Sequence, residues 1–319
     1  MLFSLIDRAM DVTVVPGYSR IGYEVRRRAW PDKALSLSGR TVVLTGATAG
    51  LGRAAAEEIA GLGATLILVA RSPERGQAAV DEIVAATGNE DVTLVIGDLS
   101  ELASVRAAAA RIVELAPAVN VLINNAGVMP PEREVTADGI ELTFATNVVG
   151  PFLLTELLGD ALRAGAPSRV INVSSGGMYT QKLDLDDPQT ERREYDPPAV
   201  YARTKRAEVL LTQEWSRRWA GRGVVIHAMH PGWADTPGVQ SSLPTFRRVT
   251  APILRSPGQG ADTIVWLAAA DEPARSTGGF WHDRRERPVD RFPGTHAGLG
   301  DAQRLYALCA GLAGLDADA

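Results

Sequence analysis

The chain has 319 residues, of which 45% are hydrophobic and 22% charged, and this composition excludes general disorder and allows a sizeable core. The formal net charge of -5 argues against a nucleic-acid-binding protein, which needs a basic face to neutralise phosphates. The single cysteine, Cys309, excludes an internal disulfide and a thiolate metal cage, and it fits a reducing compartment.

Residues 1–37 form an N-terminal arm that combines basic and apolar side chains. The basic residues are Arg20, Arg26, Arg27, Arg28 and Lys33, with Arg40 shortly after the arm, and the apolar residues are Leu2, Phe3, Leu5, Ile6 and Trp30. Two interpretations stay open: peripheral contact with a membrane surface, or packing of the arm on the domain or on a neighbouring subunit. Charged residues interrupt the apolar run, and no stretch approaches about 18 apolar residues, so we expect a cytoplasmic protein.

Short β-branched runs then alternate with helical stretches. We expect strands at residues 41–44, 65–69, 92–96, 119–123, 169–173 and 224–226, with a last strand near 279–281. We expect helices at residues 51–62, 74–86, 102–115, 142–162 and 201–219. This alternation predicts an α/β fold, a Rossmann-type doubly wound parallel sheet of about seven strands in three α/β/α layers. We assign the catalytic domain to residues 38–285 and a C-terminal tail with a helix to residues 286–319.

A glycine-rich turn follows the first expected strand. Its cofactor-binding candidates are Thr45, Gly46, Thr48, Ala49, Gly50, Leu51 and Gly52. Glycine permits a tight turn and lets a pyrophosphate approach amide groups at a helix N-terminus. An ordinary strand-to-helix loop is the alternative, but the position between the first strand and a helix is typical of a dinucleotide site.

The second expected strand ends at Arg71 and Ser72, where NAD-binding folds usually carry an acidic residue. A guanidinium binds a 2′-phosphate by charge-assisted hydrogen bonds, whereas a carboxylate repels it. The pair therefore favours NADP(H), with NAD(H) as the alternative. Arg71 could also lie in solvent near Glu74.

Tyr201 and Lys205 are four positions apart at the start of a helical stretch, so they share one helix face. An ammonium close to a phenol lowers the pKa of the phenol, which can then exchange a proton with a substrate oxygen.

These motifs occur in the order found in the short-chain dehydrogenase/reductase family, which the chain resembles from about residue 40 to 280. The carrying residues are the glycine turn, Asp98-Leu99, Asn124 to Gly127, Asn147, Ser174-Ser175, Tyr201 with Lys205, and Pro231-Gly232. Residues 173–178, 181–183 and 230–239 also resemble one branch of that family.

The resemblance implies an NAD(P)-dependent oxidoreductase that transfers a hydride between nicotinamide and a carbonyl or alcohol. It implies that Tyr201 is the general acid or base, and that Lys205 tunes Tyr201 and holds the nicotinamide ribose. It also implies that Ser175 binds the substrate oxygen and that Asn147 keeps a water for a proton relay. It further assigns cofactor contacts to Asp98, Leu99, Asn125, Ala126, Gly127, Pro231, Gly232 and Thr236. Asp98 could instead cap the next helix, Asn147 could satisfy a buried backbone group, and Ser174 could replace Ser175 as the functional serine. The family also implies a homodimer or homotetramer that pairs the helices at residues 142–162 and 201–219.

Ser175 and Tyr201 are 26 positions apart, more than is usual in the family, because a charged segment at residues 181–198 lies between them. We expect a surface insertion that leaves the site intact and changes the substrate entrance. Met178 and Trp233 are candidate substrate contacts, and with Tyr179, Phe246 and Trp266 they favour a lipophilic substrate if they face the pocket.

Other functional classes fit less well. Ser175 lacks the glycine that a hydrolase elbow needs, and the histidines show no metal-ligand spacing, so we expect no metal site. A nucleotide-binding scaffold or redox sensor on the same fold is the second hypothesis, disfavoured because both the phenol and the ammonium are present.

Overall fold

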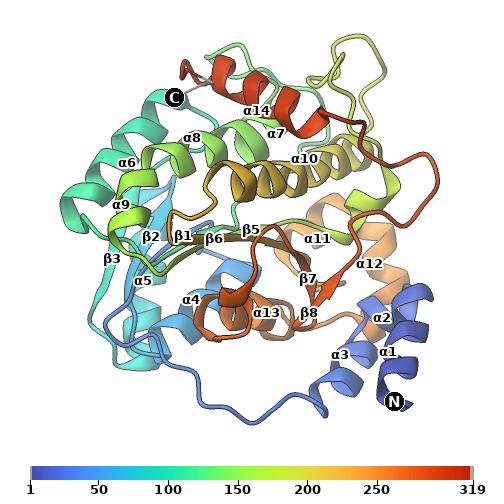
Figure 1. Ribbon diagram of the computed structural model, residues 1–319, viewed down its shortest axis with the longest axis horizontal. Coiled ribbons are helices and arrows are strands. Elements are labelled where there is room, and N and C mark those ends of the chain that lie inside the picture. The colour runs from blue at the N-terminus through green and yellow to red at the C-terminus, as the bar shows by residue number, and fades with distance from the viewer. Residues whose placement is uncertain (1, 317–319) are drawn as a thin grey trace.

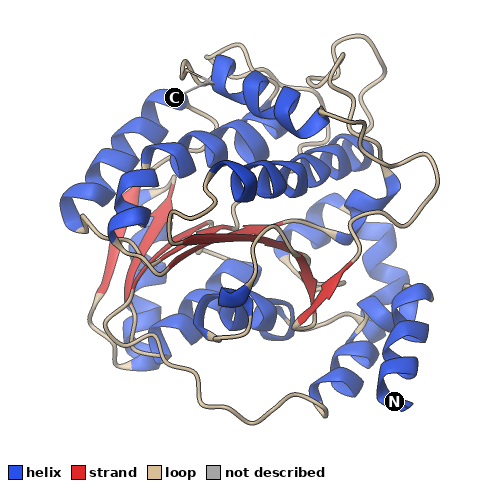
Figure 2. Ribbon diagram, viewed as in Figure 1, coloured by secondary structure: helices blue, strands red, loops and turns tan. Residues whose placement is uncertain are grey.

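The computed structural model describes residues 2–316 and shows a central sheet between two layers of helices (Figure 1, Figure 2). The strands follow the order β3-β2-β1-β4-β5-β6-β7-β8. Their bounds are β1 Thr41–Thr45, β2 Thr65–Ala70, β3 Val92–Ile96, β4 Val121–Asn124, β5 Ser168–Val173, β6 Val224–Met229, β7 Phe280–His282 and β8 Arg285–Arg287. The chain thus forms the expected α/β/α doubly wound sheet.

Strands β1 to β7 pair in parallel, and β8 adds an antiparallel edge to β7. The sequence predicted about seven strands, and the eighth was missed because it has only three residues, two of them exposed. It crosses the expected domain boundary at residue 285. Because the order reverses between β1 and β4, the carboxyl ends of these two strands form the crevice where such folds bind ligands.

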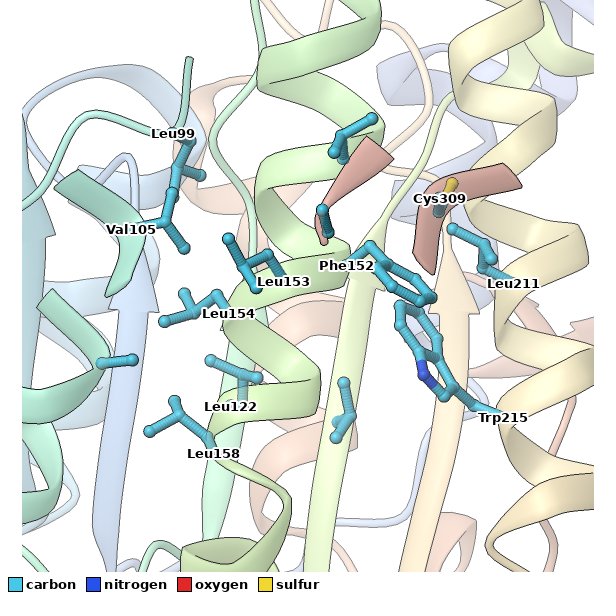
Figure 3. Packing of buried hydrophobic residues seen from close by; sticks show 14 of the residues in the cluster. Leu99, Val105, Leu122, Phe152, Leu153, Leu154, Leu158, Leu211, Trp215 and Cys309 are labelled. Atoms are coloured by element: carbon cyan, nitrogen blue, oxygen red, sulfur yellow. The ribbon is translucent and has the colours of Figure 1, made fainter. Parts of the chain in front are cut away.

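Two apolar clusters hold the layers together. One joins the sheet to α4 (Gly50–Gly61), α5 (Pro73–Thr87) and α13 (Pro257–Ala269). The other joins its opposite face to α6 (Leu102–Leu115), α8 (Gly150–Leu157), α10 (Pro197–Arg218) and α14 (Asp301–Leu312). Figure 3 shows the second cluster, where Phe152 of α8 stacks on Trp215 of α10 with ring centroids 5.6 Å apart.

The helix expected over residues 142–162 is not continuous. It consists of α7 (Leu142–Phe144), a π-helical turn η1 (Ala145–Val149), α8 and α9 (Gly159–Ala164). Gly150 and Gly159 begin the last two pieces, and glycine weakens helix continuity. The π turn contains Asn147, and such turns frequently occur at functional sites.

The remaining short elements lie mainly near the loops that flank β5 to β7. They are η2 (Gly176–Thr180), α11 (Pro237–Ser242), α12 (Pro244–Thr250), η3 (Ala251–Ile253) and η4 (Pro273–Arg275). The segment at residues 181–196 has no helix or strand, as expected for an insertion, and α10 begins at Pro197. Asp187 holds it together by accepting hydrogen bonds from the Glu191 amide at 2.7 Å and from Arg193 at 3.1 Å.

The N-terminal arm forms α1 (Leu2–Val12), α2 (Val15–Tyr18) and α3 (Arg20–Arg27), which pack beside β7 and β8. The interface is an ion-pair cluster in which Arg26 donates to Asp7 at 2.6 Å and to Asp283 at 2.7 Å. Of the two interpretations, packing of the arm on the domain accounts for Arg26, whose side chain is only 2% exposed.

The apolar side chains at the start of the arm are described only in part. Ile6 is exposed, whereas the side chains of Leu2, Phe3 and Leu5 lie outside the described part of the structure. Within residues 2–316, the structure contains no helix with the length and apolar character needed to cross a membrane.

Candidate active site

The glycine turn between β1 and α4 has the shape of a phosphate cradle. A Cβ atom at Gly46 would lie 2.8 Å from the Ala126 Cα, and one at Gly52 would lie 2.2 Å from the Gly46 carbonyl oxygen. The backbone therefore approaches itself too closely for any other residue type. Helix α4 begins at Gly50 after Ala49, which supplies no side-chain cap, so its first amide groups are available to an anion.

Hydrogen bonds tie this turn to the end of β4. The Thr45 hydroxyl accepts hydrogen bonds from the amides of Asn125 at 3.0 Å and Ala126 at 3.1 Å. The Asn125 side-chain amide donates to the carbonyl oxygens of Thr45 and Gly46. The start of the loop after β4 is thus fastened to the glycine turn.

The ends of β2 and β3 carry the residues predicted to contact the adenosine half of the cofactor. Arg71 is exposed, and Ser72 caps α5 by accepting from the Arg75 amide while its hydroxyl donates to Glu74 at 2.9 Å. Asp98 accepts from the amide and the hydroxyl of Ser100, so its carboxylate stabilises a local turn. Leu99, which follows it, is buried against Gly150.

Tyr201 and Lys205 lie on α10 above the end of β5, with the Lys205 Nζ 5.5 Å from the centroid of the Tyr201 ring. Lys205 donates from Nζ to the Val173 carbonyl oxygen at 2.9 Å. A Cβ atom at Gly127 would lie 3.3 Å from the Lys205 Nζ and 3.4 Å from the Asn147 Oδ1. Segments far apart in sequence therefore converge on the predicted catalytic pair.

The two serines after β5 have different surroundings. The Ser174 hydroxyl donates to the Lys205 carbonyl oxygen at 2.7 Å and is buried. Ser175 is half-buried and accepts from the Gly177 amide at 3.1 Å. Ser174 therefore fastens α10 to β5, and Ser175 is the serine whose hydroxyl can still donate to a ligand.

Asn147 is fully buried in the π turn. Its Oδ1 accepts from the Val128 amide at 2.8 Å, and its Nδ2 donates to the Val128 carbonyl oxygen and to the Thr204 hydroxyl, both at 3.0 Å. These bonds fix the segment after Gly127 to α10.

The loop after β6 forms the other wall. Gly232 has φ +74°, and Thr236 caps α11 by accepting from the Val239 amide. A Cβ atom at Gly50 would lie 3.3 Å from the Thr236 Cβ, so this loop reaches the glycine turn. The predicted contact at Thr236 is therefore adjacent to the cofactor cradle.

The apolar candidates separate into two groups. Trp233 is half-buried and makes an edge-on contact with Phe246 of α12 at 5.2 Å between ring centroids. Met178 is fully buried, and its sulfur accepts a hydrogen bond from Arg206, so its side chain is part of the interior. Trp266 does not face the pocket, because it lies on α13 and packs against Trp281 of β7.

Sequence analysis missed two residues near the site. Tyr18 of the arm accepts from the Trp233 amide at 2.8 Å through its carbonyl oxygen, and a Cβ atom at Gly176 would lie 2.5 Å from its ring. Glu208 accepts from the Lys205 Nζ at 2.6 Å. The helical spacing of three positions between Lys205 and Glu208 was a signal for the second contact, whereas no local pattern pointed to Tyr18.

Burial and neighbouring charges act in opposite directions on the catalytic pair. Burial raises the pKa of the Tyr201 phenol, Lys205 lowers it and Glu208 raises it, and the net effect is a rise. Burial lowers the pKa of Lys205, but Glu208 and Tyr201 outweigh burial and keep it above the usual value.

Residues 40–185 match the family model described as short chain dehydrogenase. The chain is 43% identical over 275 residues to dehydrogenase/reductase SDR family member 12 of Bos taurus, with 85% of this chain and 86% of that protein covered. It is also 40% identical over 300 residues to retinol dehydrogenase 13 of Homo sapiens, with 91% and 88% covered. The chain belongs to the short-chain dehydrogenase/reductase family, and the branch indicated by residues 173–178, 181–183 and 230–239 is that of family member 12.

Solved structures agree with this assignment. A crystal structure of a protein from Mycobacterium Paratuberculosis is 32% identical with a TM-score of 0.70, covering 90% of this chain and 98% of that one. A short chain dehydrogenase from Burkholderia cenocepacia J2315 in complex with NADP is 25% identical with a TM-score of 0.61, covering 76% and 96%. The chain is therefore a pyridine-nucleotide oxidoreductase of the class that acts on CH-OH or C=O groups.

Proposed function

We propose that this protein is an NADP(H)-dependent carbonyl reductase or alcohol dehydrogenase that uses Tyr201 and Lys205 as its proton-transfer pair. The observation that carries the proposal is the convergence of Lys205, Asn147 and Gly127 beside the Tyr201 ring, next to the floor of the glycine turn. A phenol beside a buried ammonium is suited to general acid or base catalysis.

The fit of the nucleotide rests on the cradle itself. Side chains are excluded at Gly46 and Gly52, and the uncapped start of α4 supplies amide donors. When bound, the nicotinamide nucleotide supplies or accepts the hydride, and the protein supplies orientation and the proton. Residues 124–127 and Thr236 would border the nucleotide on either side of the turn.

The preference for NADP(H) rests on Arg71. Its side chain is exposed at the end of β2, where the ribose 2′ position of a nucleotide would lie. Ser72 is already engaged with Glu74 and the Arg75 amide. The guanidinium of Arg71 therefore carries the selectivity for a 2′-phosphate, and Ser72 plays a secondary part.

In reduction, the Tyr201 hydroxyl donates its proton to the oxygen of the substrate carbonyl, and Ser175 donates a hydrogen bond to the same oxygen. In oxidation, the Tyr201 phenolate removes the proton of the alcohol. Lys205 stabilises that phenolate electrostatically and would hold the nicotinamide ribose, and Asn147 would keep a water for the proton relay with Lys205.

The substrate is proposed to be lipophilic. Trp233 and Phe246 form an aromatic wall, and Tyr18 supports it from the arm. The name retinol dehydrogenase, carried by a relative with 40% identity, is consistent with an apolar substrate here. Met178 contributes only to the support of this wall, because its side chain is fully buried.

Substitution of the phenol tests the proposal. Tyr201→Phe removes one oxygen atom, so we expect NADPH-dependent turnover of a panel of apolar aldehydes and ketones to fall at least about 100-fold while NADPH binding is retained. NADPH oxidation is followed by absorbance, and nucleotide binding by fluorescence. Arg203→Gln, on another face of the same helix, serves as the matched control and should keep its turnover.

The second candidate function is a nucleotide-binding scaffold or redox sensor. It would be supported by tight NADPH binding together with the absence of NADPH oxidation by the wild type over the whole substrate panel. The presence of the phenol, the buried ammonium and an available serine in one site favours the enzyme.

A further inference from the structure

Lys205 is held by two partners. Its Nζ donates to the Val173 carbonyl oxygen at 2.9 Å and to the Glu208 carboxylate at 2.6 Å. The side chains of Lys205 and Glu208 are 3% and 9% exposed. The ammonium next to Tyr201 therefore has its own buried counter-ion, one helical turn further along α10.

One oxygen of the Glu208 carboxylate, Oε1, accepts a hydrogen bond from Lys205. Its second oxygen, Oε2, is buried and has no hydrogen-bond partner within residues 2–316. A buried carboxylate normally satisfies both oxygens, so a single bond to an ammonium leaves it incompletely stabilised. A purely structural contact does not need a carboxylate here, because a neutral side chain avoids the free-energy cost of removing a charge from water.

The charge around Glu208 comes from one residue. Lys205 is the charged group that acts on Glu208, and Tyr201 responds to both. The other titratable or charged groups on elements packed against α10 are Glu156 of α8, Tyr179 of η2, His227 of β6, Arg169 of β5, and Asp301, Arg304, Tyr306 and Cys309 of α14. None of these is among the groups that shift Glu208 in the described part of the chain.

Burial raises the pKa of Glu208 to about 7, because desolvation outweighs the attraction of the Lys205 ammonium. The carboxyl group therefore changes its charge near neutral pH. When it is ionised it offsets part of the ammonium charge, so the pKa of Tyr201 rises. When it is protonated the ammonium acts on Tyr201 without compensation.

We propose that Glu208 is a positioning residue of the active site, which holds the Lys205 ammonium against Val173 and sets, through its own charge, how strongly Lys205 favours ionisation of Tyr201. The inference rests on the proposed roles of Tyr201 and Lys205. An ionised Glu208 keeps Tyr201 protonated, which favours proton donation to a carbonyl over proton removal from an alcohol. Glu208 thus sets the pH range in which Tyr201 exchanges its proton with the substrate oxygen.

The test is the ionisation midpoint of Tyr201, measured by the ultraviolet absorbance of tyrosinate during a pH titration of the full chain. The chain has 6 tyrosines, so the Tyr201 signal is the difference between each protein and the same protein with Tyr201→Phe. Glu208→Gln keeps the shape and removes the charge, and we expect it to lower the midpoint by about one pH unit.

Two further variants separate charge from packing. Glu208→Asp keeps the charge and changes the shape, and its midpoint should stay near that of the wild type. Glu214→Gln removes another buried carboxylate of α10, one that pairs with Arg217 and Arg218, and should leave the midpoint unchanged. If Glu208→Gln does not fold by circular dichroism, Glu208→Asn replaces it with a smaller neutral amide.

A midpoint that is equal in the wild type and in the neutral variants would overturn the proposal, as would the absence of a Tyr201 signal from both before unfolding. Binding of NADPH is measured in parallel by fluorescence. Failure of the wild type to bind NADPH would contradict the proposed function, whereas the titration still reports whether Glu208 controls Tyr201. The two failures are therefore distinguishable.

Discussion

Asp283 joins Arg26 of the arm to Arg255 of the domain through one buried carboxylate. Its carboxylate accepts from Arg255 at 2.6 Å and 2.9 Å and from Arg26 at 2.7 Å, and all three side chains are at most 2% exposed. Burial raises the pKa of Asp283, but the guanidiniums of Arg255 and Arg26 outweigh burial and hold it below the usual value. The carboxylate is therefore ionised whenever the protein is folded at neutral pH.

Removing that charge leaves two buried guanidiniums without their shared counter-ion. We expect Asp283→Asn to lower the free energy of unfolding by about 3–5 kcal/mol, measured by urea denaturation at pH 7. Because the folded pKa is depressed, this stabilisation is present above the unfolded pKa and is lost as the pH falls through the folded value. The difference in the free energy of unfolding between Asp283→Asn and the wild type should therefore become smaller in strong acid.

Asp160→Asn is the matched control, because Asp160 forms an exposed pair with Arg163 and should change stability by less than about 1 kcal/mol. Equal stabilities for Asp283→Asn and the wild type would show that the buried cluster does not anchor the arm.

At the scale of elements, α14 has an unexpected position. It lies across α8 and α10 (Figure 1), where the Tyr306 hydroxyl donates to Glu156 at 2.9 Å and the Tyr306 ring contacts Phe152 at 5.0 Å. Leu305 and Cys309 are fully buried there. These two helices lie in the segments through which the family resemblance implied subunit pairing, and in this chain its own C-terminal helix packs on them.

We therefore expect α8 and α10 not to pair between subunits, and the purified protein to have the mass of one chain, 33.9 kDa, by light scattering. A variant that ends before Gly300 exposes Phe152 and Trp215, and it should self-associate. A dimer of the full chain that persists on dilution would contradict this expectation.

Sequence patterns predicted elements best where the signal is local. The helix at residues 102–115 was predicted with the observed bounds. The helix expected at residues 201–219 begins earlier, at Pro197, because proline is favoured in the first turn of a helix, and it ends one residue earlier, at Arg218. The π turn at residues 145–149 was missed, because no local pattern indicates the hydrogen bonds that Asn147 within it makes to Val128 and Thr204.

At the scale of the whole molecule, the site is assembled at the carboxyl edge of the sheet from loops that follow β1, β4, β5 and β6. The order of motifs along the chain was sufficient to predict this convergence, because parallel strands bring their carboxyl ends to one edge. The contribution of the arm was not predictable, since Tyr18 meets Trp233 through contacts 215 positions apart that leave no local pattern. The sequence also left open which groups Arg26 contacts, because its partner Asp283 is 257 positions away.

The central claim, that the glycine turn and Arg71 bind NADP(H), is tested most directly by fluorescence titration of the wild type, Arg71→Asp and Arg75→Asp with NADPH and NADH. Arg75 is exposed one turn into α5 and serves as the control. We predict that the wild type binds NADPH at least about tenfold more tightly than NADH, that Arg71→Asp reverses this order, and that Arg75→Asp does not. Binding of neither nucleotide by the wild type would contradict the account.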